Sequence, residues 1–403
     1  MKLDRHSLVF TLVIAGMVAL PPLSIDMILP AIPSIAAGLG TGPARAGLAI
    51  SLFLLGFALS QVVLGPASDR VGRRPVLLAS CALFSAGGLG CSLAGSTALL
   101  FTLRLVQGLG AGGCSVIIFA IVRDLFEGSE VRSKLASANA IMGIAPMIAP
   151  SIGALLLAWF SWRGLFTFLA AGGLALLLGT SLLVEESIGP NRRRVGARQL
   201  AAGYLRVLSV RSVAGCTLVS SLSFGLLQSF VIGSSFLFLE FLRVTPRAYG
   251  LAFAAISSGI VWGSLAAGRC AARGVSYQRT LLAGILMGIT GSLVLLALHL
   301  AGAITVWTAI GSLLFITTAL GLINPTAAHG VLEPMAQVAG TASAVLGCVR
   351  MAGGAAASAL VSLSTNGSPG AMIAVMLLCS LGALAAWITM VRPSAAGLEP
   401  AAG

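Results

Sequence analysis

Twelve apolar segments, each long enough to cross a membrane, dominate this sequence of 403 residues. A membrane-crossing helix needs roughly 20 apolar residues. Hydrophobic residues make up 58% of the chain and charged residues 9%, whereas an ordinary soluble domain is about 45–50% apolar and about 25% charged. A water-soluble globule cannot bury this much apolar surface, so we expect lipid to surround the chain. The predicted spans are 8–30, 44–66, 75–95, 99–121, 135–159, 162–184, 213–239, 248–269, 280–300, 304–327, 337–362 and 368–391.

One basic segment interrupts the series and divides it into six spans and six spans. Residues 185–211, "EESIGPNRRRVGARQLAAGYLRVLSVR", hold six arginines. We predict an N-terminal six-helix bundle at 1–184, a cytoplasmic linker at 185–211 with a short surface helix near 198–206, and a C-terminal six-helix bundle at 212–403. The linker arginines are expected to lie against anionic lipid headgroups. The first span is too long for the core of a signal peptide and lacks a cleavage site, so we expect it to be retained.

The net charge of +13 is explained by membrane topology rather than by nucleic-acid binding. Basic residues concentrate on the cytoplasmic side of membrane proteins. With a cytoplasmic N-terminus, 18 of the 24 lysines and arginines fall on that side. The other six are Arg45, Arg163, Arg243 and Arg247 on the outer side, and Arg104 and Arg350 within spans. We therefore expect both termini to be cytoplasmic, in a multi-pass protein of a bacterial inner membrane.

The usual marks of an enzyme are absent from the sequence. None of the seven cysteines forms a C-x-x-C pair, so we expect neither a disulfide framework nor a metal site. The run "GLGAGG" at 108–113 matches a dinucleotide-binding pattern, but no strand precedes it, and glycines inside a span favour close helix packing. No phosphate loop, Ser/His/Asp set or H-E-x-x-H motif occurs. We predict no enzymatic activity and no organic or metal cofactor.

A charged link between the second and third spans identifies a family resemblance. The segment at 65–74, "GPASDRVGRR", resembles the G-x-x-x-D-R-x-G-R-R motif of the major facilitator superfamily. In that family the link holds the cytoplasmic side in one of two states. The resemblance implies a tight turn at Gly65 and Gly72, and ion pairs with neighbouring spans, with Asp124 as the expected partner. The residues carried over to this cytoplasmic gate are Gly65, Asp69, Arg70, Gly72, Arg73, Arg74 and Asp124.

Three further segments narrow the resemblance to twelve-span drug:proton antiporters. "SIDMILPAIPSIA" at 24–36 is similar to the end of their span 1, and "RLVQGLGAGG" at 104–113 is similar to their span 4 motif. "GIAPMIAPSIGA" at 143–154 resembles the span 5 motif of exporters, although alanine replaces two glycines of that pattern. Its matching residues are Gly143, Pro146, Pro150 and Gly153. Together these segments resemble the Bcr/CflA type, which includes bicyclomycin-resistance proteins and chloramphenicol or florfenicol exporters.

Asp26 is the acid predicted to lie well inside a span. A charge at the bilayer centre costs about 2.5–3.5 kcal/mol on insertion scales, and charged groups inside spans usually serve function. We interpret Asp26 as the proton carrier. Counted from the predicted span ends, Asp26 and Arg104 lie at one level, about 6–9 Å below the outer boundary. Asp26 would pair alternately with Arg104 and with solvent. A static ion pair between the two, or an Asp26 that caps a turn ahead of Pro30, is the alternative.

Arg350 is a basic residue near the middle of span 11, and no acid of the C-terminal half is obviously placed to meet it. It either binds a polar group of the substrate or is a structural arginine bonded to carbonyls. Amides within spans are candidates for the substrate pathway or for bonds between helices. The predicted substrate-binding residues are Asp26, Gln107, Asn139, Gln228, Asn324 and Arg350.

These features predict a proton-coupled exporter that works by alternating access between two bundles. Aromatic residues make up only 6% of the chain, which favours a neutral, moderately polar drug such as a phenicol over a large cationic dye. Transport of a metabolite such as an amino acid, sugar or nucleoside on the same scaffold is the alternative. A receptor or channel subunit would need neither Asp26 nor the 65–74 link. The expected partners are a small-molecule substrate and membrane lipid, with the chain acting as a monomer.

Overall fold

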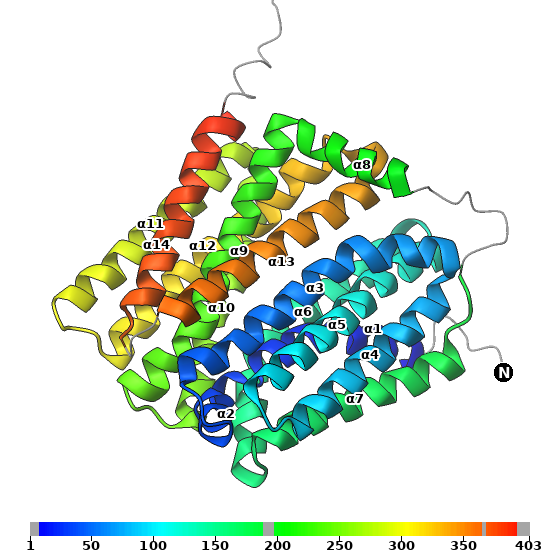
Figure 1. Cartoon of the computed structure of the whole chain (residues 1–403). Helices are drawn as coiled ribbons and strands as arrows, with labels where there is room; N and C mark the ends of the chain where they lie inside the picture. Colours follow the sequence, from blue (N-terminus) through cyan, green and yellow to red (C-terminus); the bar gives the residue numbers. More distant parts are fainter. Residues whose placement is uncertain (1–7, 188–196, 365–367, 393–403) are drawn as a thin grey trace, which may run out of the picture. The chain divides into compact units, whose positions relative to one another are not determined.

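The computed structural model describes residues 8–187, 197–364 and 368–392, and these are almost entirely helical. Two compact units divide the chain, at Met1–Gly196 and Ala197–Gly403. Figure 1 shows the helices of the first unit from blue to green and those of the second from green to red. The elements of the first unit are α1 (Leu8–Asp26), η1 (Leu29–Ala31), α2 (Ile32–Gly38), α3 (Pro43–Val71), α4 (Arg73–Leu93), α5 (Thr97–Leu125), α6 (Gly128–Trp159) and α7 (Trp162–Leu183).

The second unit begins with a short helix and continues with six long ones. Two of its long helices end in a π-helical turn. Its elements are α8 (Ala197–Ser209), α9 (Arg211–Ser235), η2 (Phe236–Phe241), α10 (Pro246–Ala272), α11 (Tyr277–Leu300), α12 (Val306–Leu332), η3 (Ala336–Val338), α13 (Ala339–Ser364), α14 (Gly370–Ala386) and η4 (Trp387–Val391).

Twelve of the described helical segments are long and apolar enough to cross a membrane, which confirms the predicted fold class. Large apolar side chains also cover the outside of the spans. Trp159 and Trp307, for example, are 78% and 81% exposed. Exposed apolar surface of this extent is expected of a protein that lipid surrounds. The short surface helix predicted near 198–206 corresponds to α8, while residues 188–196 of the linker lie outside the described part of the chain.

The first span is longer than the sequence predicted, and it is broken. It runs from Phe10 to Gly38, rather than ending at residue 30. A proline is tolerated in the first turn of a helix, where its missing N–H is not needed. Pro30 is the second residue of the turn η1, and Pro33 is the second residue of α2. The chain therefore continues across the membrane after a break at Met27 and Ile28.

Each unit has its own apolar core. In the first unit, Phe10, Met17, Leu77, Cys81 and Ile118 belong to one cluster that joins α1, α4 and α5. In the second unit, Val213, Leu281, Ile323, Ala342 and Ala383 join α9, α11, α12, α13 and α14 in the same way. Both clusters include small side chains, so the helices pack closely.

The glycine run 108–113 is where α5 meets its neighbours most closely. A Cβ on Gly108 would collide with the backbone of Phe53 on α3, and a Cβ on Gly110 would collide with Phe84 on α4. The run lies inside α5, with no strand before it. It packs helices together, as the sequence indicated, and does not cradle a phosphate.

Replacement of Gly108 by alanine should therefore destabilise the first unit. We expect G108A to lower the free energy of unfolding by about 1–3 kcal/mol, because the added methyl group overpacks the contact with α3. G172A is the matched control, since Gly172 is exposed on α7 and nothing lies within 4 Å of its Cβ position. Its stability should be unchanged or raised, because alanine favours helix. Melting of the purified proteins in detergent measures both. Equal melting temperatures for the two variants would contradict the packing role of Gly108.

Candidate functional site

The turn between α3 and α4 consists of a single residue, Gly72. Its φ of +121° lies in the region that favours glycine, and it ends α3 and begins α4 at once. A Cβ at this position would also meet the Glu186 carboxylate at 2.5 Å. Gly65 was expected to form part of the turn, and this expectation was wrong. It lies inside α3, where its Cβ position is 3.3 Å from Val116 of α5, so its small size serves helix packing.

Arg73 holds the centre of the 65–74 link. Its Nη1 lies 2.7 Å from Asp69 Oδ1, and its Nε lies 3.1 Å from Asp124 Oδ2. Nη1 also donates to Ser68 Oγ at 2.6 Å. The arginine is 7% exposed, so water screens the pair with Asp124 only weakly. The structure thus brings together three of the gate residues named from the family motif.

Glu186 completes this arrangement, and the sequence analysis did not single it out. Its carboxylate accepts the backbone N–H of Arg73 at 2.9 Å and that of Arg74 at 3.2 Å, at the first turn of α4. The first N–H groups of a helix have no partner within it and favour a negative charge. Ser187 Oγ donates to Asp124 at 3.2 Å, and Arg74 Nη2 donates to Ser181 O at 2.7 Å. The chain that leaves span 6 is therefore bound to the link.

Asp26 is the last residue of α1 and lies at the break in span 1. Its side chain is 4% exposed. Span 1 continues for twelve residues after Asp26, to Gly38, so Asp26 lies deeper than the predicted end at residue 30 implied. Met27, the next residue, has its backbone against Gly153 of α6, which has no side chain to separate them. The broken helix of span 1 and the span 5 motif are therefore in contact.

The other residues of the span 5 motif have different surroundings. Pro146 and Pro150 both lie inside α6, and Pro150 is buried. Nothing lies within 4 Å of the Cβ position of Gly143. Of the two glycines of the motif, Gly153 makes the close contact with the break in span 1.

Arg104 is fully buried on α5, beside the end of α1. Its Nη2 donates to Ser24 O at 3.1 Å, its Nε to Ala49 O at 3.2 Å and its Nη1 to Gln107 Oε1 at 2.7 Å. The Phe53 ring lies 4.3 Å from its Cζ. Within the described residues no ion pair joins Arg104 to Asp26. The static pair considered from the sequence is therefore not formed, and neutral oxygens accept from Nε, Nη1 and Nη2 instead.

The amides named from the sequence lie in both units. Gln107 is fully buried, and no described group accepts from its Nε2. The side chain of Asn139 lies outside the described residues. In the second unit, Gln228 is 3% exposed on α9, and Asn324 precedes Pro325 inside α12. Neither Gln228 Nε2 nor Asn324 Oδ1 has a hydrogen-bond partner among the described residues.

Arg350 lies at the middle of its span, fourteen residues from either end of Ala336–Ser364. Its Cζ lies 4.7 Å from the centre of the Phe224 ring on α9. The carbonyl bonds of the structural alternative are not found among the described residues, and its Nε is buried without a hydrogen-bond partner.

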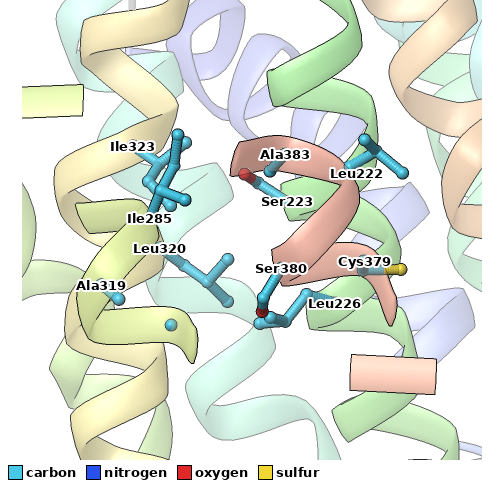
Figure 2. A pocket seen from close by; sticks show the side chains of 11 residues that line it. Leu222, Ser223, Leu226, Ile285, Ala319, Leu320, Ile323, Cys379, Ser380 and Ala383 are labelled. Atoms are coloured by element: carbon cyan, nitrogen blue, oxygen red, sulfur yellow. The ribbon is translucent and has the colours of Figure 1, made fainter. Parts of the chain in front are cut away.

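A small cavity lies inside the second unit, between α9, α11, α12 and α14. Figure 2 shows its lining, which is apolar apart from Ser223 and Ser380. Its volume is about 10 Å³, whereas pockets for drug-sized molecules have roughly 300–1,000 Å³. A cavity of this size cannot hold a drug.

An all-helical membrane protein with twelve spans and charged side chains inside them has the architecture of a secondary transporter. A family model described as "Major Facilitator Superfamily" matches residues 14–358. The chain belongs to this family. It is accordingly a multi-pass membrane protein of a transporter family rather than an enzyme.

Curated relatives and solved structures agree with this assignment. The chain is 30% identical to an uncharacterised transporter of this superfamily, YdgK of Bacillus subtilis, over 90% of each chain. It is 29% identical to the multidrug resistance protein MdtL of Escherichia fergusonii, over 95% of this chain and 96% of that protein. A crystal structure of a D-xylose–proton symporter has a TM-score of 0.72 at 14% identity and covers 94% of this chain and 97% of that one, which shows a common fold.

Removal of the Glu186 carboxylate should loosen the first turn of α4. Loss of a helix cap costs about 0.5–2 kcal/mol, so we expect E186A to speed hydrogen exchange at the amides of Arg73 and Arg74. E185A is the matched control: it removes the neighbouring acid, for which the described structure records no such bond. Hydrogen-exchange mass spectrometry of the peptide over residues 72–77 measures both variants. Unchanged exchange in E186A would contradict the capping role.

Proposed function

We propose that this protein exports small, moderately polar drugs in exchange for protons, as a transporter of the Bcr/CflA type. Phenicols such as chloramphenicol and florfenicol, and bicyclomycin, are the proposed substrates. The name of the relative MdtL, a multidrug resistance protein similar over 96% of its length, supports drug efflux. The proposed setting is a bacterial inner membrane with both termini cytoplasmic. The proton is the coupling ion, and a single chain is the working unit.

The observation that carries the proposal is the position of Asp26. Its side chain is buried where α1 ends and span 1 is broken. No ion pair joins it to another described residue. An acid held inside a span without a fixed counter-charge is costly, and it is suited to bind and release a proton. Asp69, Asp124 and Glu240 lie within two residues of the ends of their spans. Asp26 is therefore the acid that we assign to coupling.

Arg104 is the residue through which we propose that the charge on Asp26 affects the neighbouring helices. The carbonyl of Ser24, which accepts from Arg104, lies in the last turn of the helix that carries Asp26. A negative charge on Asp26 attracts the guanidinium, and protonation removes this attraction. We assign to Arg104 the response to this change: its bonds to Ser24 and Ala49 strengthen or weaken with the charge on Asp26.

The 65–74 link is the proposed cytoplasmic gate. Arg73, Asp69 and Asp124 form a charged cluster at the end of α3, and Glu186 extends it to the chain after span 6. Alternating access requires an element with two arrangements. We propose that these bonds are made in one state of the transport cycle and broken in the other.

Transport then follows as an exchange. Asp26 takes a proton from the outer side, the change at Arg104 favours the state open to the cytoplasm, and release of the proton there lets drug bind. Return to the outward state carries the drug out. The proton moves down its gradient and the drug moves against its own.

Replacement of Asp26 by asparagine tests this coupling. We expect D26N to lose export driven by a pH gradient in inverted membrane vesicles, at least about tenfold, because the amide cannot carry a proton. Downhill exchange of labelled drug for unlabelled drug should persist. E240Q is the matched control, because Glu240 lies near the end of span 7 and is given no part in coupling. Full gradient-driven export by D26N would refute the assignment.

Drug specificity needs a separate measurement. Expression in a pump-deficient bacterium should raise the inhibitory concentrations of chloramphenicol, florfenicol or bicyclomycin. No change for any of the three would favour the alternative, a proton-coupled transporter of a metabolite.

A further inference from the structure

Arg350 lies at the middle of span 11, and the described structure gives its guanidinium no oxygen acceptor. The contrast with other arginines is direct. Arg104 donates to two carbonyls and to Gln107, and Arg163, which stacks on Trp162, donates to Ala94 O. Arg350 stacks on Phe224, yet its Nε is buried without a hydrogen-bond partner. A buried charged donor that lacks an acceptor is costly.

The described acids of the second unit do not compensate this charge. Glu240 lies at the end of span 7, sixteen residues along the chain from Phe224. Glu333 lies just past the end of α12 and contacts His329 at 3.1 Å. Neither forms an ion pair with Arg350. The positive charge at the middle of span 11 thus has no partner within the described part of its own unit.

A second unpartnered donor lies on the same helix pair. Gln228 is one turn beyond Phe224 on α9, and Gly354 is one turn beyond Arg350 on α13. The Cβ position of Gly354 lies 2.5 Å from Phe224 and 3.0 Å from Gln228 Cγ, so the two turns face each other. Gln228 is 3% exposed, and its Nε2 has no described acceptor. Both orphan groups are N–H donors.

The helices that carry these donors, α9 and α13, are closely packed. Ser221 Oγ donates to Val349 O at 2.7 Å, which ties α9 to the residue before Arg350. A Cβ on Gly353 would collide with Ser221. The Phe224 ring lies against the guanidinium, whose planar fork of N–H groups is suited to bind two oxygens in plane.

We propose that Arg350, Phe224 and Gln228 form a subsite for a group that bears two oxygens on one atom, namely a nitro, sulfonyl or carboxylate group of an aromatic substrate. The forked guanidinium binds two such oxygens side by side, and the amide of Gln228 supplies a further donor. The aromatic part of the substrate continues the stack at Phe224. This subsite rests on the proposed export function and names the chemical group by which the substrate is recognised.

Export of a matched pair of compounds tests the subsite. Chloramphenicol carries a nitro group on its ring, and its reduced analogue carries an amine in the same place. Since hydrogen bonds to charged groups contribute roughly ten- to a hundredfold, we expect the wild type to favour the nitro compound at least about tenfold in inverted vesicles. In R350M the ratio should fall to within about twofold. R350K, which keeps the charge and loses the fork, should lie between. An unchanged ratio in R350M would overturn the proposal.

Thermal stability separates recognition from a structural role. A structural arginine loses bonds when it becomes methionine, and the melting temperature of the full-length protein then falls. R163M is the matched control, because Arg163 is stacked on Trp162 and also bonded to a carbonyl, and we expect it to melt earlier. R350M should melt at or above the wild-type temperature. A fall in R350M equal to that in R163M would show a structural role and overturn the subsite.

A third measurement keeps the subsite testable if phenicols are not substrates. Wild-type protein that exports neither compound would refute the phenicol assignment alone. Benzoate and benzyl alcohol, which differ in the two-oxygen group, are then compared as stabilising ligands in the melting assay. We expect benzoate to raise the melting temperature of the wild type and not of R350M. Equal effects of the two compounds on the wild type would overturn the subsite, whatever the outcome for D26N.

Discussion

Hydrocarbon offers no hydrogen bonds to a peptide chain, and the whole architecture depends on this constraint. Each backbone N–H and C=O inside the membrane has to be satisfied by the protein itself, so the spans are helices. Irregular backbone is tolerated only where protein covers it or where it lines a pathway. The break at Met27 and Ile28 obeys this rule, because both residues are buried. It is also the place where Asp26 lies, so the cost of a broken helix and the cost of a buried acid fall at one point of span 1.

The same solvent makes the two buried arginines informative. Arg104 donates hydrogen bonds to Ser24, Ala49 and Gln107, so the protein itself supplies acceptors for this buried charge. Arg350 stacks on Phe224 and retains an unused donor. Since lipid cannot solvate either charge, the difference between them lies in what the protein provides. We attribute the unused donor of Arg350 to a group of the bound substrate that accepts from it.

Sequence reasoning predicted the long elements well and the local connections poorly. The twelve spans could be predicted because each is a run of apolar residues long enough to cross a membrane, and such a run is visible in the sequence itself. The extent of span 1 did not follow, because a proline can stand just after one helix or in the first turn of the next, and the sequence does not distinguish the two cases. The pairing of Asp26 with Arg104 was inferred from their charges and their predicted depth, whereas in the structure two backbone carbonyls and the Gln107 side chain accept from Arg104. Backbone acceptors leave no trace in a sequence.

In the 65–74 link, too, the sequence predicted some of the interacting residues and not others. Its motif located Arg73, Asp69 and Asp124, since charges in an apolar chain stand out. Glu186 escaped notice because its function is set by the distance in space to the first turn of α4, and two adjacent acids after a span resemble an ordinary membrane boundary.

The contact of Glu186 with the N–H of Arg73 joins residues 113 positions apart. A ribosome therefore makes the turn at Gly72 long before it makes the carboxylate that binds there. During synthesis, spans 2 and 3 enter the bilayer with the first amides of α4 facing water. Their final arrangement waits until span 6 has been inserted and the chain behind it has emerged. The proposed gate can therefore form only after the six spans of the first unit have been made.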